Sequence, residues 1–224
     1  MARYYEYQGK KLPSVTTITG QLDKPALTYW AANCAADFIR DEISKQEEIS
    51  KENLLSVIEK SRKEWRKVGR TAMDIGSEVH ACIETYLSKG EEPLRPQDAV
   101  ENAFLAFLEW LDTWESWQTV HTEQTLFGEK YAGTCDWVVQ LKHDLWDAPR
   151  LFVVDFKSSK GVYDEYKYQI AAYRHLIPGC EGSGILRLDK ETGYPDWHDV
   201  SKSHHYDLMI FDCLTELFYL TNQF

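Results

Sequence analysis

The period of the hydrophobic pattern changes near the middle of the chain, and this change limits the folds that the sequence can adopt. In the first half, apolar residues recur at helical spacing, as in the segment PALTYWAANCAADFIRDEI at residues 25–43. In the second half, the apolar segments become short and rich in β-branched and aromatic residues, which is typical of strands. This order of elements predicts a mixed α/β core with a helical N-terminal extension.

Four helices are expected in the first half, after an extended segment, LPSVTTIT, at residues 12–19. Pro25 lies just inside the start of the first helix, where proline is well tolerated. Ser50 is a candidate N-cap of the second, and Gly90 is placed to end the third. The predicted helices cover residues 25–43, 50–67, 71–90 and 102–117.

Three strands are expected next, at residues 118–128, 131–141 and 149–159, joined as an antiparallel meander. The third is the most apolar, so we expect it to be the most buried. A helix over residues 162–177, a strand over 184–190 and a closing helix over 206–222 complete the pattern. We therefore expect residues 1–75 to form an N-terminal extension and residues 76–224 to form one folded domain.

The composition excludes several classes of protein. No apolar run approaches the roughly 18 residues of a membrane span, and the N-terminus lacks the apolar stretch of a secretory signal, so we expect neither a membrane protein nor an exported one. The five cysteines include no CxxC pair, which argues against a disulfide framework, a zinc site or an iron–sulfur cluster. Reduced thiols in a cytoplasmic compartment fit this pattern best.

A basic strip interrupts an otherwise acidic chain whose formal net charge is −11. The strip has two interpretations, a solvated helix face or a surface that contacts nucleic acid. If one helix continues through it, positions 62, 66 and 70 form one cationic row and positions 63 and 67 another, with Trp65 able to stack on a base. The candidate DNA-binding residues are Lys60, Arg62, Lys63, Trp65, Arg66, Lys67 and Arg70.

The motif VVDFKSS places two opposite charges on the most apolar strand. Period-two alternation puts Asp155 and Lys157 on one face and Phe156 on the other. Charges in a buried strand are costly unless they are paired or bound to metal. Taken alone, the motif fits an ordinary ion pair at a strand end as well as a catalytic site.

The strand before it contributes a second carboxylate. A hairpin between the two strands can bring Asp136 beside Asp155, and two neighbouring carboxylates suit Mg²⁺ or Mn²⁺. The alternative is that Asp136 simply faces solvent.

Two helical motifs flank these strands. In GSEVHACIETYL, His80 and Glu84 are one helical turn apart, and in YQIAAYRHL, Gln169 and Tyr173 have the same spacing. Taken alone, His80 fits a histidine on a half-buried helix, and the other pair fits capping and packing roles.

Together, the motifs G-x-x-x-H, G-x-x-D, D-x-K and Q-x-x-x-Y, on helix, strand, strand and helix, resemble the PD-(D/E)XK nuclease superfamily, in particular its RecB-like exonuclease branch. The resemblance spans roughly residues 76–176, about half of the chain. The opening LPSVTTITGQLDKPALTYWAA is similar to the N-terminal segment of phage, archaeal and mitochondrial genome-maintenance exonucleases of that branch.

The resemblance implies a restriction-endonuclease-like core and a role for each motif residue. His80, Asp136 and Asp155 would bind Mg²⁺ or Mn²⁺, with the Phe156 carbonyl as a further ligand. Lys157 would be the catalytic lysine. Gln169 and Tyr173 would support the catalytic carboxylates, and Glu123 matches a frequent acidic position. Relatives that hold an iron–sulfur cluster have three grouped cysteines near the C-terminus; here only Cys180 and Cys213 follow the core, so no cluster is expected.

The implied function is a metal-dependent exonuclease acting on DNA, with single-stranded ends as substrate, in replication, repair or recombination. By the resemblance, the N-terminal helices would arch over the active site. The expected location is the cytoplasm of a bacterial, archaeal or phage-infected cell. Two alternatives remain open: a structure-specific endonuclease on the same fold, and a non-catalytic DNA-binding protein.

Overall fold

A computed structural model describes residues 2–95 and 97–222, and the chain divides into two compact units. One unit combines the chain up to Leu22 with the chain from Glu78 onward, and the other spans Asp23–Ser77. The boundary at Ser77 lies close to the expected one at residue 75. The first 22 residues, however, belong to the same unit as the chain from Glu78 onward.

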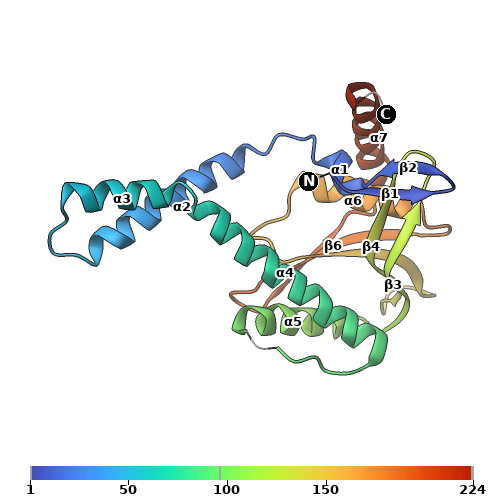
Figure 1. Cartoon of the computed structure of the whole chain (residues 1–224). Coiled ribbons are helices and arrows are strands. Elements are labelled where there is room, and N and C mark those ends of the chain that lie inside the picture. The colour runs from blue at the N-terminus through green and yellow to red at the C-terminus, as the bar shows by residue number, and fades with distance from the viewer. Residues whose placement is uncertain (1, 96, 223–224) are drawn as a thin grey trace. The chain divides into compact units, whose positions relative to one another are not determined.

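A five-stranded sheet organises the first unit (Figure 1). Its strands are β3 (Ser116–Phe127), β4 (Ala132–Lys142), β5 (Arg150–Lys157), β6 (Gly182–Leu188) and β7 (Pro195–Asp199), in that order across the sheet. The predicted antiparallel meander is β3, β4 and β5, and β6 pairs parallel to β5. A parallel pair needs a crossover connection, here provided by helix α6 (Asp164–His175). Strand β7 was not predicted.

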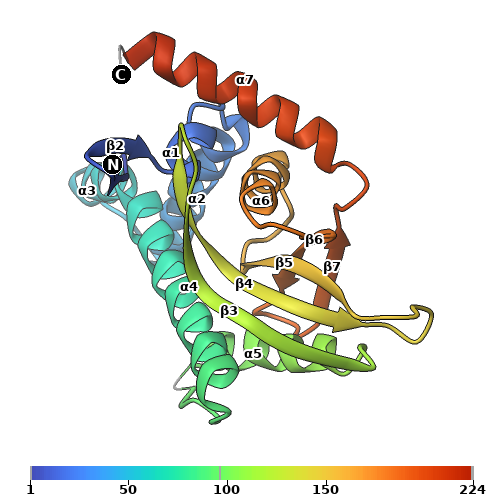
Figure 2. The same cartoon turned by 90° about the vertical axis from the view of Figure 1, so that its right-hand side faces the viewer.

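Helices cover both faces of this sheet (Figure 2). Helix α5 (Asp98–Leu111) packs on β6 and β7, and α6 packs on β4, β5 and β6. Helix α7 (His204–Asn222) lies outside α6. Helix α4 (Glu64–Lys89) ends against α5, where the Tyr86 ring meets the edges of Phe104 and Phe107. None of the described helices is long and apolar enough to cross a membrane.

The two faces of the sheet have different cores. The α5 side is aromatic: the Phe156 ring contacts Phe107 and Trp137. The α6 side is mostly aliphatic and includes Val153, Ile170 and Ile185. Residues alternate between the faces along β5, as expected, so Phe156 anchors the aromatic core while Asp155 reaches Gln169 on α6.

The N-terminal segment differs from the prediction. Strands β1 (Tyr4–Tyr7) and β2 (Lys10–Pro13) form a hairpin, and residues after it form a short helix, α1 (Val15–Thr19). The prediction of an extended segment over residues 12–19 is therefore wrong beyond Pro13. The Ser14 side chain caps α1 by accepting a hydrogen bond from the Thr17 N–H, and Val15 and Ile18 are fully buried. Capping and burial outweigh the β preference of these branched residues.

The second unit contains α2 (Pro25–Ser44), α3 (Lys51–Ser61) and the beginning of α4. The single helix predicted over residues 50–67 is interrupted, because α3 ends at Ser61 and α4 begins at Glu64. Arg62 is the C-cap of α3, whereas Arg66 and Arg70 lie on α4. One helix does not continue through residues 62–70, so the condition for the two continuous cationic rows is not met. The helix predicted over 102–117 also ends early, at Leu111, because β3 already begins at Ser116.

Candidate metal and catalytic site

Three carboxylates occupy equivalent positions on three adjacent strands. Continuing the register of β3 and β4, which pairs Thr122 with Trp137, places Glu123 opposite Asp136. Continuing the register of β4 and β5, which pairs Trp137 with Val154, places Asp136 opposite Asp155. Adjacent strands are about 4.8 Å apart, so the sheet itself brings the three carboxylates into one row.

His80 approaches this row from helix α4. Its Nδ1 lies 3.6 Å from Asp136 Oδ1, and its Nε2 lies 3.1 Å from the Phe156 carbonyl oxygen. The Phe156 N–H in turn donates to Asp136 Oδ2 at 2.7 Å. Contacts with the backbone and side chains of β4 and β5 therefore hold His80 and Asp136 together.

Glu123 completes a cluster that could hold a metal ion. One ligand atom each of His80, Glu123 and Asp136 lies within 4.8 Å of the other two. Glu123 has a φ of +47°, a left-handed conformation that is uncommon outside glycine and costs free energy. Burial and the charge of Asp136 both raise the pKa of the Glu123 carboxyl group. A strained backbone at an acidic residue is a feature that clusters at functional sites.

Asp155 and Lys157 form a buried ion pair beside this cluster. Lys157 Nζ lies 2.5 Å from Asp155 Oδ2, and the Asp155 side chain is almost fully buried. Gln169 Nε2 donates to Asp155 Oδ1 at 3.1 Å and lies 3.4 Å from the Tyr173 hydroxyl oxygen. Helix α6 thus fixes the carboxylate from one side, as the spacing of Gln169 and Tyr173 suggested.

The site has an excess of negative charge. Burial raises the pKa of Asp155, although the charge of Lys157 opposes this, and the nearby Asp136 carboxylate raises it further. Burial lowers the pKa of Lys157, but the charges of Asp155 and Asp136 outweigh burial and leave it raised. The same unbalanced carboxylate charge therefore disfavours the Asp155 anion and favours the Lys157 cation.

The donor set fits a divalent cation. Asp155 Oδ2 is buried, and the Lys157 ammonium, 2.5 Å away, is the charged group that offsets the cost of its burial. Carboxylates and a carbonyl are suitable ligands for Mg²⁺ and Mn²⁺, and an imidazole favours Mn²⁺ over Mg²⁺. A cation here would also offset the charge of the carboxylate row.

The predicted ligands are not all equivalent in the structure. His80 and Asp136 share the cluster with Glu123, the residue whose role was least defined from sequence. Asp155 lies next in the row, but its carboxylate is engaged by Lys157 and Gln169. The Phe156 carbonyl is within hydrogen-bond distance of His80 Nε2, so it is oriented toward the cluster.

Sequence reasoning missed one further residue of the site. The Lys157 ammonium lies over the ring of Tyr166, 4.9 Å from its centroid. Tyr166 precedes Gln169 by three residues on α6, and this helical spacing was a usable signal. The ring covers Lys157 and limits the directions that its ammonium group can take.

The candidate DNA-binding residues belong to the part of the chain before Glu78. Arg62 pairs with Glu59, Lys67 pairs with Glu64, and the Arg66 guanidinium lies over the exposed Trp65 ring. These local contacts agree with both original interpretations, a solvated surface and a nucleic-acid surface. The role of Lys60, Lys63 and Arg70 stays a prediction.

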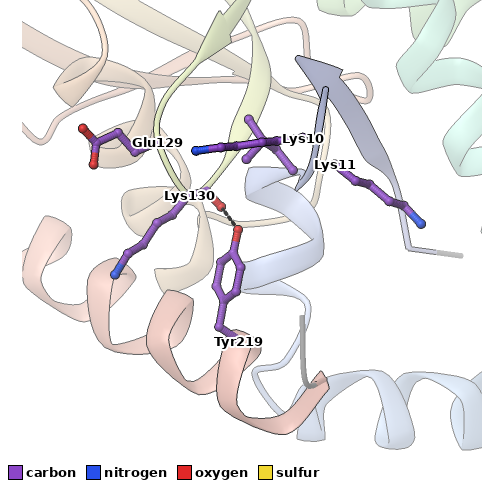
Figure 3. A pocket seen from close by; sticks show the side chains of 6 residues that line it. Lys10, Lys11, Glu129, Lys130 and Tyr219 are labelled. Atoms are coloured by element: carbon purple, nitrogen blue, oxygen red, sulfur yellow. Dashed lines mark hydrogen bonds between the residues drawn. The ribbon is translucent and has the colours of Figure 1, made fainter. Parts of the chain in front are cut away.

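A separate hollow of about 550 Å³ contains none of these residues (Figure 3). It lies between the β1–β2 hairpin, the β3–β4 turn and α7. A volume of this size does not by itself indicate a functional site. Its lining residues are Lys10, Lys11, Leu12, Glu129, Lys130 and Tyr219.

Comparison with known proteins adds no assignment: no protein-family model and no curated protein matches the chain. Any functional conclusion therefore depends on the geometry of the site and on the motifs that form it.

Proposed function

We propose that this protein is a metal-dependent nuclease that hydrolyses phosphodiester bonds in DNA. The observation that carries the proposal is the row of Glu123, Asp136 and Asp155 across three strands, with Lys157 paired to its last member. The Asp155 side chain is almost fully buried and that of Asp136 is largely buried, and burying unbalanced carboxylates destabilises the folded state, so stability alone does not account for the arrangement. A bound cation would offset the carboxylate charge, and the cation together with Lys157 would bind a phosphate substrate.

His80, Glu123, Asp136 and Asp155 are the residues that would hold Mg²⁺ or Mn²⁺, with the Phe156 carbonyl beside them. When bound, such a cation lowers the pKa of a coordinated water and offsets charge at phosphorus. Lys157, held by Asp155 and Tyr166, would orient the attacking water and stabilise the negative charge that develops on the phosphate. Gln169 would keep Asp155 in place for both tasks.

The finer assignment comes from the sequence motifs. A restriction-endonuclease-like core agrees with the order of β3, β4, β5, α6 and β6, and with the positions of the motif residues on them. The resemblance to RecB-like exonucleases extends the proposal to digestion from single-stranded DNA ends during replication, repair or recombination.

The decisive assay compares end-labelled linear DNA with covalently closed circular DNA, in Mg²⁺ or Mn²⁺ and in EDTA. An exonuclease degrades the linear DNA only, an endonuclease nicks the circle, and a non-catalytic DNA-binding protein leaves both intact. Asp155→Asn is the variant that tests the site, since it keeps the side-chain volume and removes the charge. Metal-dependent cleavage that persists in this variant would refute the assigned site.

Cation binding is measured separately, by titrating the protein with Mn²⁺ in a calorimeter. Asp136→Asn should weaken binding, because it removes an oxygen charge from the cluster. Asp98→Asn, an exposed acid at the start of α5, is the control and should bind Mn²⁺ as the parent does. Equal affinities for parent and Asp136→Asn would contradict the metal assignment even if DNA were cleaved.

A further inference from the structure

The closing helix α7 carries apolar residues on two sides. On its inner side, Phe211, Leu214 and Phe218 are buried in the core against α6 and α1. Its outer side exposes a second set, in which Tyr206 keeps 70% and Leu220 78% of its surface accessible. A helix that is apolar on both sides is typical of one that is covered on both sides. The outer set is Tyr206, Met209, Ile210, Cys213, Leu217 and Leu220.

The outer residues follow the spacing of a helix-packing seam. Tyr206, Ile210, Cys213, Leu217 and Leu220 are separated by four, three, four and three positions. This alternation keeps one continuous stripe along a helix and is the pattern by which two helices interdigitate. Scattered apolar side chains are ordinary on a protein surface, but a continuous stripe marks an interaction surface. The surface therefore fits another helix.

Helix α7 is firmly attached beneath this stripe. The Tyr219 hydroxyl donates to the Lys130 carbonyl at 2.7 Å (Figure 3). The Lys130 ammonium pairs with Glu216, which lies on the same helix as Tyr219. Gln21 Nε2 also donates to the Leu214 carbonyl at 2.9 Å. The Lys130 pair partly neutralises Glu216, which borders the stripe, so its charge is a smaller obstacle to an apolar contact.

We infer that the outer side of α7 packs against α7 of a second copy of this chain, around a twofold axis close to Cys213. Cys213 lies midway between Tyr206 and Leu220, so the stripe presents apolar side chains at matching distances on either side of its centre. In a twofold interface the same patch is used by both copies, and a residue at its centre meets its own counterpart. A stripe that is nearly symmetric about one residue meets this requirement.

The exposed area is sufficient for such a dimer. From the exposed fractions of the other five outer residues, with Cys213 also exposed, the outer side of α7 presents on the order of 500 Å² per chain. Two copies would then bury about 1,000 Å², which is the size at which a specific interface begins. An interface at the lower end of the specific range is typical of reversible association, so the dimer should dissociate on dilution.

Sedimentation velocity over a range of protein concentrations tests the inference. The parent should convert from monomer to dimer, and Leu217→Glu should raise the dissociation constant at least about tenfold, because it places a charge in the seam. The matched control is Leu105→Glu on α5, since Leu105 is 47% and Leu217 48% exposed and both lie on helices. This control should dimerise as the parent does. A parent that stays monomeric at about 100 µM, or a dimer insensitive to Leu217→Glu, overturns the proposal.

Oxidation with diamide locates the axis. Two Cys213 thiols from two copies would lose their hydrogens to diamide and form one intermolecular disulfide, seen as a dimer on a non-reducing gel. Cys213→Ser should abolish this band, whereas Cys34→Ser should retain it. A dimer in solution that gives no Cys213-dependent band contradicts the twofold contact at this residue.

Discussion

The glycine of the G-x-x-D motif offers the most direct test of how the fold supports the site. A Cβ added to Gly133 would lie 2.6 Å from Cε1 and 3.3 Å from the hydroxyl oxygen of Tyr173, and 3.1 Å from Val15 Cγ2. The first of these contacts is too short to be tolerated, so one side chain must move. Tyr173 is almost fully buried and contacts Gln169, which binds Asp155. Gly133→Ala should therefore act on the carboxylate row through α6.

The expected cost is that of overpacking a well-filled core, about 1–3 kcal/mol of unfolding free energy. A double-mutant cycle with Tyr173→Ala isolates the clash, because removing the ring leaves room for the new methyl group. In the Tyr173→Ala background, Gly133→Ala should cost less than about 1 kcal/mol, although Tyr173→Ala alone costs several kcal/mol by creating a cavity.

Urea unfolding of the four proteins, followed by circular dichroism, gives these values from the midpoints at constant slope. Gly161→Ala is the matched control, because a Cβ there meets no atom within 4 Å and the loop lies between β5 and α6. Its midpoint should equal that of the parent or be slightly higher. A Gly133→Ala protein as stable as the parent, or a cycle with no coupling between the two positions, would refute the reasoning.

Three further predictions address chemistry and charge. Lys157→Met should lower DNA cleavage at least about a hundredfold with the circular dichroism spectrum retained, and near-parental turnover would remove Lys157 from the reaction. Gln169→Leu removes the donor to Asp155 Oδ1 and should cost about 1–3 kcal/mol, so an unchanged urea midpoint would contradict the proposed contact. Backbone N–H groups of Thr192 and Glu191 lower the pKa of Asp189 to about 2, so its charge stabilises the fold above about pH 4 and stops doing so as the pH falls toward 2. Asp189→Asn should therefore lower stability by about 1 kcal/mol at pH 7, after discounting for the exposed part of the carboxylate, and by only about a third of that at pH 2.5; equal losses at both pH values would exclude this cause.

The sequence predicted the structure best in segments whose apolar residues follow a single period, either that of a strand or that of a helix. The alternation in VVDFKSS correctly separated Phe156 from Asp155 and Lys157, because each side of β5 packs against a different layer. The spacing of Gln169 and Tyr173 likewise placed both on one side of α6. In these segments local pattern and tertiary packing impose the same requirement, so the pattern alone was sufficient.

In other segments the secondary structure depends on tertiary contacts, which the local sequence pattern does not reveal. Residues 15–19 are helical because Ser14 caps the helix and because Val15 and Ile18 are buried in the core. These contacts outweigh the β preference of the sequence VTTIT. The break between Ser61 and Glu64 follows no proline or glycine, so no sequence signal for it was available. Strand β7 lies at the sheet edge, and its short polar sequence PDWHD resembles a loop until β6 pairs with it.

The position of Glu123 shows how far such reasoning extends to the site. Its acidic side chain was visible in the sequence, but its place beside Asp136 depends on the register of β3, which shifts between Thr119 and His121. Because a shift of one residue turns every later side chain to the other face of a strand, this irregularity decides which residues of β3 face the cluster. The positive φ of Glu123 is uncommon for glutamate, so the residue type did not predict it. The chemistry of the row was therefore predictable from residue types, whereas its third member required the three-dimensional register.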